Sequence, residues 1–317
     1  MGEILILSAG RRVSLVRSFQ TAALAHGLTV TTADMNPAMS SACNIADKQL
    51  KLPHVQSDIY AEQLIAYCSQ NDVRLVIPTI DTELAVLASL RAELALCGCT
   101  AIVCNSDLIS ICRDKRKTAA FFDGFGIRSP LLYTSENIQF PLFIKPYDGS
   151  LSSGAMVIHS IDEITPKILA NSKNIYCEYL DHSRFAEYTC DAYFNAAGDI
   201  KCVVPRLRLE VRGGEVSKGK TERNNIVAFL FKKLSHLQGA RGCLTIQIMR
   251  NIETGDLYLV EINPRFGGGY PLTAQAGAVY HSWLIEEYVT GATIARYDGW
   301  QDGLNMLRYD AEVFIAT

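Results

Sequence analysis

This sequence lacks both a strong net charge and a long apolar segment. Thirty Lys and Arg residues stand against 33 Asp and Glu, a formal net charge of −3, and this balance provides no global field that attracts a polyanion. The apolar runs are broken well before the roughly 20 residues that a membrane-spanning helix needs. We therefore expect no nucleic acid and no membrane as partner, and a soluble, cytoplasmic protein without a targeting segment.

Paired cysteines and histidines are also lacking. The ten cysteines are scattered without a C-x-x-C motif, and Cys97 and Cys99 form the only close couple. The six histidines show neither zinc-ligand spacing nor a Ser-His-Asp arrangement. Buried free thiols in a reducing compartment are therefore the expected state of the cysteines.

The chain is long enough for two or three domains, with 317 residues. Its first hundred residues alternate between short apolar runs and segments of helical periodicity. Strands are expected over residues 3–7, 28–32, 74–78 and 100–104, and helices over residues 13–26, 59–71 and 83–96. This alternation predicts a parallel sheet with helices on both faces.

The first turn of this domain resembles a dinucleotide-binding fingerprint only in part. A turn at Ser8-Ala9-Gly10 is followed by an acid, Asp34, at a suitable distance. However, the fingerprint needs three glycines, and Arg11 and Arg12 occupy the positions where the backbone must approach a pyrophosphate. We therefore interpret this segment as a structural α/β domain and not as an NAD site.

The middle of the chain combines cationic residues with a loop of small residues. A helix is expected over residues 107–122, where Arg116 and Lys117 are predicted to lie on a solvated face. Lys145 lies in an expected strand over residues 141–146, and a Gly/Ser loop leads from it into a strand over residues 155–159. Backbone N–H groups of such a loop can close over phosphates, although most Gly/Ser loops are only turns.

A predicted hairpin near the C-terminus gathers oxygen-bearing side chains. Strands over residues 243–250 and 257–263 are joined by a polar turn. With Thr254 at its centre, Gln247 lies opposite Glu261, and Asn263 shares their face. One carboxylate with two amides suits Mg²⁺ that also holds phosphates; a solvated strand edge is the alternative.

Two further expectations follow from the same hairpin. The opposite face should be core and consists of Ile246, Ile248, Val260 and Ile262. Arg265 follows directly after the hairpin, where its guanidinium can bind a phosphoryl or carboxylate oxygen bidentately.

Taken in order along the chain, these motifs resemble the ATP-grasp superfamily. The motifs are Lys115, Lys145 with its glycine loop, Glu178-Tyr179-Leu180, Glu187, Gln247 and Glu261-Ile262-Asn263-Pro264-Arg265. The chain is most similar to the branch of the carbamoyl phosphate synthetase large chain and the pyrrolysine-biosynthesis ligases. The resemblance implies an α/β protein with a Rossmann-like pre-ATP-grasp domain (1–110), followed by a two-lobed ATP-grasp fold with a small lobe (111–180) and a large lobe with the metal site (181–317).

The resemblance also implies roles for individual residues. ATP would be bound by Lys115, Lys145, Gly149, Ser150, Ser152, Ser153, Gly154, Cys177, Glu178, Tyr179, Leu180 and Glu187. Among these, the hinge 177–180 would read the adenine and Glu187 the ribose. One or two Mg²⁺ ions, which Mn²⁺ can replace, would bind Gln247, Glu261 and Asn263, although many relatives carry an acid in place of the glutamine. Lys145 and Arg265 would act in catalysis.

Substrate contacts are expected from four positions, each with a plain structural alternative. Asp81 follows a parallel strand, where ligands gather, and would hold an amine or cap the next helix. Arg208 and Lys220 would contact substrate or form a basic surface. Gly268 lies in a glycine run that would form an anion-binding nest or a loop of positive φ.

The implied reaction is the ATP-dependent ligation of a small-molecule carboxylate to an amine or amino acid through an acyl phosphate, with release of ADP and phosphate. Two alternatives remain: a kinase of the same fold that phosphorylates a small molecule, and a non-catalytic ATP-binding module. The chain has a single grasp unit, so carbamoyl phosphate synthesis and biotin carboxylation are not expected. A homodimer is the expected assembly.

Overall fold

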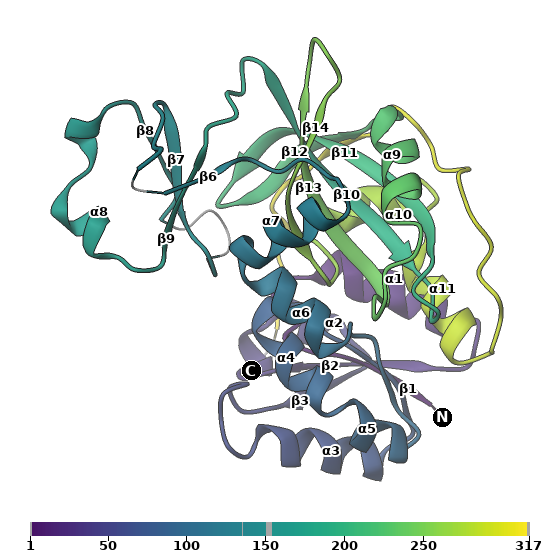
Figure 1. Cartoon of the computed structure of the whole chain (residues 1–317). Coiled ribbons are helices and arrows are strands. Elements are labelled where there is room, and N and C mark those ends of the chain that lie inside the picture. The colour runs from purple at the N-terminus through teal and green to yellow at the C-terminus, as the bar shows by residue number, and fades with distance from the viewer. Residues whose placement is uncertain (1, 135, 150–153, 316–317) are drawn as a thin grey trace.

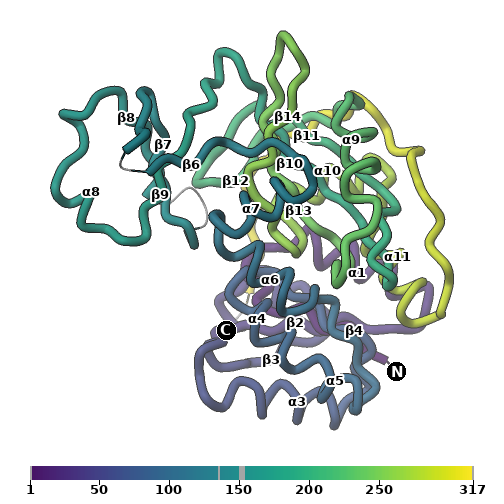
Figure 2. The backbone as a smooth tube through the Cα atoms, in the orientation of Figure 1, coloured from purple at the N-terminus to yellow at the C-terminus, as the bar shows by residue number. Residues whose placement is uncertain are grey.

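The computed structural model describes residues 2–134, 136–149 and 154–315, which are arranged around three β-sheets (Figure 1). One apolar cluster runs continuously through the first and the third sheet. The second sheet stands out to one side (Figure 2) and has a small core of its own around Leu142, Ile144 and Ile158. No helix among these residues is long and apolar enough to cross a membrane.

The first sheet is parallel, as predicted, and has the strand order β3-β2-β1-β4-β5. Its strands are β1 (Glu3–Ile6), β2 (Thr29–Asp34), β3 (Lys48–Lys51), β4 (Val73–Ile77) and β5 (Thr100–Ala101). Side chains alternate between its faces. Leu5 therefore packs in one cluster with residues of α3 (Tyr60–Gln70), whereas Ile4 packs in another with residues of α1 (Val13–Leu24). The predicted α/β class with helices on both faces is confirmed.

One local expectation for this domain is wrong, and some short elements were not predicted. The helix expected over residues 83–96 is divided at Leu90 into α4 (Asp81–Ser89) and α5 (Arg91–Leu96). The edge strand β3 and the short helix α2 (Ser41–Ile45), which follows the 3₁₀ turn η1 (Pro37–Met39), were not expected. The sequence of β3 is Lys-Gln-Leu-Lys with three exposed side chains, so no apolar alternation marks it as a strand.

The third sheet is antiparallel and has the order β14-β13-β10-β11-β12-β15. Its strands are β10 (Phe185–Phe194), β11 (Ile200–Arg212), β12 (Glu215–Thr221), β13 (Gly242–Asn251), β14 (Leu257–Asn263) and β15 (Asn305–Leu307). Helix α9 (Asn225–Lys233) packs its buried side chains into the core on one face of this sheet. Helices α10 (Tyr270–Gln275) and α11 (Tyr280–Tyr288) join the second core, which is shared with α1. The segment after α11 then runs along the outside of the molecule (Figure 1, yellow).

The hairpin of β13 and β14 has the predicted pairing of Gln247 with Glu261, but its register shifts next to this pair. Beyond the shift Ile248 pairs with Leu259, so Val260 is the extra residue of a β-bulge. Leu259 and Ile262 are buried in the core, whereas Val260 and Glu261 both line the cleft described below. The expectation that Val260 is a core residue is therefore wrong, because the bulge turns two consecutive side chains toward the same face.

The small sheet has the order β6-β9-β7-β8. Its strands are β6 (Leu132–Tyr133), β7 (Leu142–Pro146), β8 (Met156–Ile158) and β9 (Asn174–Glu178), and η2 (Ile161–Glu163) and α8 (Pro166–Ala170) connect the last two. β7 and β8 pair as an antiparallel hairpin, as predicted for the strands around the Gly/Ser loop.

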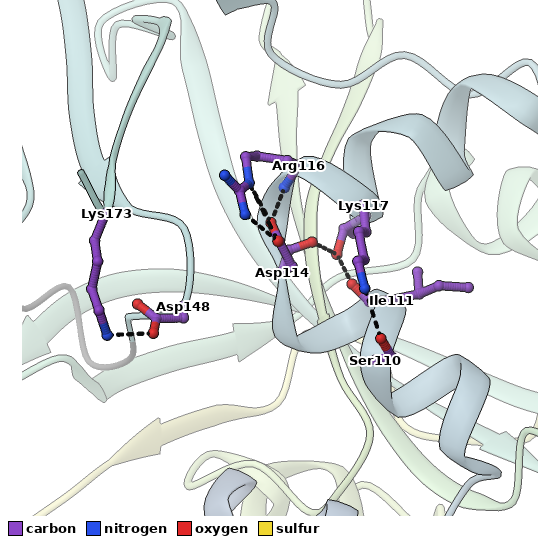
Figure 3. Close-up of polar contacts among 8 residues, drawn as sticks. Ser110, Ile111, Asp114, Arg116, Lys117, Asp148 and Lys173 are labelled. Atoms are coloured by element: carbon purple, nitrogen blue, oxygen red, sulfur yellow. Dashed lines mark hydrogen bonds and ion pairs between the residues drawn. The ribbon is translucent and has the colours of Figure 1, made fainter.

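The helix expected over residues 107–122 is in fact two helices, α6 (Ser106–Arg113) and α7 (Lys115–Gly124). Asp114 separates them because its backbone is extended and its carboxylate accepts a hydrogen bond from the backbone N–H of Arg116 at 2.9 Å, which caps α7. The side chain of Arg116 folds back onto the same carboxylate, and Lys117 donates to Ser110 (Figure 3). Both cations are exposed, as predicted. The cap leaves Lys115 as the first residue of α7, which packs against β14 of the large sheet.

Candidate active site

A cleft of about 680 Å³ lies where the three sheets meet. One face of the large sheet forms its floor, through side chains of β10, β11, β13 and β14. Strand β7 and the end of β9 contribute from the small sheet. The loops after β1 and β4 contribute from the parallel sheet, at the carboxyl ends of neighbouring strands, where open α/β sheets bind ligands.

Charged and amide side chains occupy the floor. Arg208 Nη1 and Gln247 Nε2 both donate to Glu187 Oε1, each at 2.5 Å. The three residues come from the adjacent strands β11, β13 and β10, and the side chains next in sequence, such as Tyr188 and Ile248, point into the core instead. Because the amide nitrogen of Gln247 is engaged by Glu187, its amide oxygen remains available to a ligand in the cleft.

Glu261 joins the floor to the small sheet. Its Oε1 accepts a hydrogen bond from Asn263 Nδ2 at 3.0 Å, and its Oε2 lies 3.4 Å from Lys115 Nζ. The same ammonium donates to the carbonyl of Gly149 at 2.7 Å. Lys115 therefore links the carboxylate on β14 to the first residue of the Gly/Ser loop.

Lys145 projects from β7 into the cleft. No hydrogen-bond acceptor is found for its ammonium among the described residues, and the nearest aromatic ring, Phe143, has its centre 5.8 Å away. Burial lowers the pKa of Lys145, and Lys115 lowers it further, while Cys177, Glu261 and Glu187 oppose this effect. A half-buried cation without a partner is a suitable binding site for an anionic group.

The segment expected to form the hinge follows the end of β9. Cys177 pairs with Phe143 on one side and with Leu132 on the other, and burial raises the pKa of its thiol. The carboxylate of Glu178 accepts a hydrogen bond from the backbone N–H of Leu131 at 3.2 Å. Tyr179 and Leu180, which lie beyond the strand, also line the cleft.

Arg265 lies at the other end of the cleft, against the parallel sheet. Its Nη2 is 2.9 Å from Asp81 Oδ2, in an ion pair that connects β14 with the N-terminus of α4. Its Nε is buried and has no hydrogen-bond partner in the described part of the chain. Asp81 is the first residue of α4, and its side chain does not cap the helix. The alternative expectation for Asp81, that it caps the next helix, is therefore wrong.

The glycines after Arg265 are required by close packing. A Cβ atom on Gly269 would lie 2.0 Å from Arg206 Nη1, and one on Gly268 would lie 2.9 Å from the carboxyl carbon of Glu215. None of Gly267, Gly268 and Gly269 has a positive φ, so the expected left-handed loop is wrong. The run is needed because two charged side chains approach its backbone.

Most of the residues singled out in the sequence line this cleft. They are Asp81, Lys115, Lys145, Gly149, Cys177, Glu178, Tyr179, Leu180, Glu187, Arg208, Gln247, Glu261, Asn263, Arg265 and Gly268. Ser150, Ser152 and Ser153 lie outside the described residues. Gly154 has a positive φ and lies next to Pro146 without lining the cleft. Lys220 is paired in β12 with Leu207 and Asn305 and is not part of the lining.

Several lining residues were missed by sequence reasoning. Arg12, in the loop after β1, and Glu215, the first residue of β12, are brought to the cleft only by the tertiary fold. Arg206 is 1% exposed and forms a bidentate ion pair with Asp191, at 3.0 Å from Nε and 2.9 Å from Nη2. An Asp at the centre of an otherwise apolar strand was the signal that could have pointed to this pair.

The described residues contain no group of three His, Cys, Asp or Glu side chains arranged for a metal ion. The oxygen donors of the hairpin are one carboxylate, Glu261, and two amides, Gln247 and Asn263, all of which line the cleft. Both amides donate through nitrogen to a neighbouring carboxylate, so their oxygens remain available. This donor set fits Mg²⁺, which binds through one or two carboxylates and takes its other ligands from phosphates and water.

Two family models match the chain. Residues 4–102 match the PylC-like N-terminal domain, and residues 173–309 match the ATP-grasp domain described as belonging to the biosynthetic pathway with the Ter operon. Among curated proteins, acetyl-CoA carboxylase 2 of Oryza sativa subsp. japonica is 24% identical over 169 residues, which are 50% of this chain. The chain spans only 7% of the length of that relative.

Solved structures show the same fold at low sequence identity. The biotin carboxylase domain of 2-oxoglutarate carboxylase from Hydrogenobacter thermophilus, in complex with MgADP, ADP and bicarbonate, has a TM-score of 0.72 at 12% identity, covering 95% of this chain and 73% of that one. L-amino acid ligase from Bacillus licheniformis has a TM-score of 0.70 at 15% identity, covering 91% and 74%. N5-carboxyaminoimidazole synthetase from Staphylococcus aureus has a TM-score of 0.69 at 14% identity, covering 93% and 78%.

Proposed function

The chain is an ATP-grasp protein with a PylC-like N-terminal domain, and from this we propose that it ligates a small-molecule carboxylate to an amine or amino acid at the expense of ATP. The observation that supports this most directly is the convergence of Lys115, Lys145, Glu261 and Arg265 on one cleft. L-amino acid ligase and N5-carboxyaminoimidazole synthetase are among the structures that share the fold.

The proposed reaction has two steps. A carboxylate oxygen attacks the γ-phosphorus of ATP and ADP leaves, which converts a poor electrophile into an acyl phosphate. The amine nitrogen then attacks the acyl carbon, the bond from carbon to the phosphate oxygen breaks, and phosphate leaves. An ammonium substrate releases one proton to water before its attack and a second after it. The protein contributes positioning and charge compensation rather than a covalent intermediate.

In this proposal the small lobe holds the nucleotide together with Glu187 of the large lobe. The backbone of the hinge, residues 177–180, reads the adenine edge, and Glu187 accepts hydrogen bonds from the ribose. Lys145 binds phosphate oxygens through its ammonium, for which the described residues provide no hydrogen-bond acceptor. Lys115 does the same from its place between Glu261 and Gly149. The Gly/Ser loop, Gly149 to Gly154, excludes water that would hydrolyse the acyl phosphate.

In the same proposal the large lobe holds the metal and the reacting carboxylate. Glu261 and Asn263 would hold Mg²⁺ through oxygen, with Gln247 as the third donor; one or two ions would bind, and Mn²⁺ would substitute. The metal would supply positive charge that compensates the charge of the phosphates. Arg265 stabilises the acyl phosphate and the tetrahedral species that follows. Asp81, Arg208 and Gly268 line the space left for the two substrates.

Incubation with MgATP and a matrix of carboxylic acids and amines tests this function. We expect release of ADP and phosphate only when both substrates are present, and its loss in Lys145→Ala and Glu261→Ala. Glu253→Ala is a matched control, because that carboxylate lies exposed in the turn of the same hairpin. AMP and pyrophosphate as products would contradict the acyl phosphate mechanism, and a stable phosphate ester in the mass spectrum would indicate a kinase. ATP binding without turnover for any pair would indicate a non-catalytic module.

A further inference from the structure

The junction of the parallel sheet with the large sheet holds an excess of positive charge. Four arginines meet there, Arg11, Arg12, Arg265 and Arg308, with two carboxylates, Asp81 and Glu215. Glu215 Oε2 is 3.1 Å from Arg11 and 2.8 Å from Arg308, and Asp81 pairs with Arg265. The Arg11 side chain is 77% exposed and lies outside the cleft lining. The rest of the cluster therefore has three guanidinium groups and two carboxylates, and it lacks one negative charge.

Arg12 is the arginine of this cluster that has no carboxylate within ion-pair distance in the described part of the chain. Its Nη2 donates to the carbonyl of Thr79 at 3.0 Å and its Nη1 to the carbonyl of Phe266 at 3.3 Å. These two bonds hold the guanidinium at the edge of the cleft and leave further N–H donors unused. Burial lowers the pKa of Arg12 to about 10, and Arg265 contributes to this effect. An anion placed between the two guanidinium groups would relieve both effects.

A second observation points to the same spot. Arg265 Nε is buried and finds no hydrogen-bond partner among the described residues, although Arg265 and Arg12 both line the cleft. Gly267 to Gly269 lie in the same part of the lining, where side chains on Gly268 or Gly269 would clash. The backbone there packs against Glu215 and Arg206, and the glycines add no side chain of their own to the lining.

This anion site is distinct from the nucleotide site. Arg12 is held by the carbonyls of Thr79 and Phe266, beside the parallel sheet. Lys145 projects into the cleft from β7 of the small sheet. Arg265 connects the two sites, because it follows β14, which carries Glu261 and Asn263, and pairs with Asp81 beside Arg12.

The chemistry of the junction matches a zwitterionic head group. The unpaired guanidinium of Arg12 suits a carboxylate, and the neighbouring carboxylates of Asp81 and Glu215, which also line the cleft, suit an ammonium. A phosphate dianion fits less well, because it carries one negative charge more than the cluster lacks.

We propose that Arg12 binds the carboxylate of an α-amino acid that serves as the amine substrate, so that the first loop of the N-terminal domain selects the acceptor. The inference rests on the proposed ligase function. With the carboxylate on Arg12, the carboxylates of Asp81 and Glu215, which line the same cleft, would accept hydrogen bonds from the amino group of the acceptor.

The test compares the 20 proteinogenic L-amino acids with their α-carboxamides as acceptors, using MgATP and a panel of carboxylic acids. We expect the wild type to prefer the best amino acid over its amide by roughly 10- to 100-fold in kcat/KM, and Arg12→Gln to bring this ratio close to one by raising KM for the acid alone. Arg12→Lys keeps the positive charge but loses the two parallel N–H donors of the guanidinium, so its acid-to-amide ratio of kcat/KM should lie between those of wild type and Arg12→Gln. Arg11→Gln removes the same charge one residue away, from a side chain that is 77% exposed and outside the cleft lining, and should keep the ratio.

Thermal unfolding in MgADP separates this inference from the ligase function. Each amino acid and amide is added to wild type, Arg12→Gln and Arg11→Gln, and MgATP alone serves as the control for an intact nucleotide site. An amino acid that raises the melting temperature of wild type and Arg11→Gln, but not of Arg12→Gln, supports the site even if no ADP is ever released. ADP release with an unchanged acid-to-amide ratio in Arg12→Gln would overturn the inference and leave the ligase standing. An absence of any carboxylate preference in both assays would overturn it as well.

Discussion

Asp191 is the residue whose removal should destabilise this protein most clearly. Its carboxylate is fully buried and accepts four hydrogen bonds: two from Arg206, at 3.0 and 2.9 Å, one from Thr245 at 3.2 Å and one from Thr273 at 2.6 Å. Asp191→Ala leaves the guanidinium of Arg206, itself 1% exposed, without its counter-ion. Breaking a buried ion pair on one side costs about 3–5 kcal/mol, a large fraction of the stability of a typical protein.

Urea unfolding followed by tryptophan fluorescence measures this loss. Both tryptophans are buried, and Trp283 stacks on Tyr280, whose hydroxyl donates to the backbone carbonyl of Asp191. The fluorescence transition therefore reports on the core around the ion pair. We expect the midpoint for Asp191→Ala to fall sharply. Asp256→Ala is the control, because its ion pair with Arg128 is exposed and should contribute no more than about 1 kcal/mol.

A second variant distinguishes the loss of the ion pair from general damage to the core. Asp191→Leu combined with Arg206→Met removes both charges and fills the space with apolar atoms, and it should recover most of the stability lost in Asp191→Ala. The reasoning is refuted if Asp191→Ala unfolds within about 1 kcal/mol of the wild type, or if the double variant is no more stable than the single one.

Three further predictions concern other residues. Burial raises the pKa of Glu83 to about 7, so the folded state keeps a proton that the unfolded state releases, and the free energy of unfolding should fall as the pH rises from about 4.5 to 7. Glu83→Gln should abolish this pH dependence. In urea titrations at pH 8 its free energy of unfolding should exceed that of the wild type by up to roughly 3 kcal/mol. Asp114→Ala removes the cap of α7 and should lower stability by about 1 kcal/mol in urea titrations, while unchanged stability would argue against capping. Glu261→Gln removes the only carboxylate among the proposed metal ligands and should raise the Mg²⁺ concentration needed for half-maximal ADP release at least tenfold, whereas an unchanged titration curve would place the metal elsewhere.

Local patterns in the sequence were sufficient for those parts of the site that depend on neighbouring segments. Gln247 and Glu261 are joined by a short turn, so the hairpin brings them together through alternation alone. The same alternation could not reveal the bulge at Val260, because an extra residue in one strand leaves the apolar pattern almost unchanged. The division of the helix at Asp114 was missed because the helical periodicity continues across the cap.

Long-range charge pairing could not be read from the sequence. Arg206 belongs to a segment that also contains Arg208 and Arg212, and only the sheet places it against Asp191, on the neighbouring strand β10. Arg12 lies more than 250 residues from Phe266, whose carbonyl it binds. No sequence spacing relates these residues, since their contact depends on how the parallel sheet packs against the large one.

The sequence by itself determined the α/β class, the parallel N-terminal sheet and the order of the motifs that resemble an ATP-grasp site, because these follow from periodicity and from short segments with characteristic residues. Only the tertiary structure decided which charges are paired and which remain open to a ligand. Lys117 is held by a neighbouring hydroxyl and Arg206 by a buried carboxylate, whereas Arg12 lies without a described counter-ion at the edge of the cleft. All three side chains carry a positive charge, and the role of each depends on the groups that folding brings within a few ångströms of it.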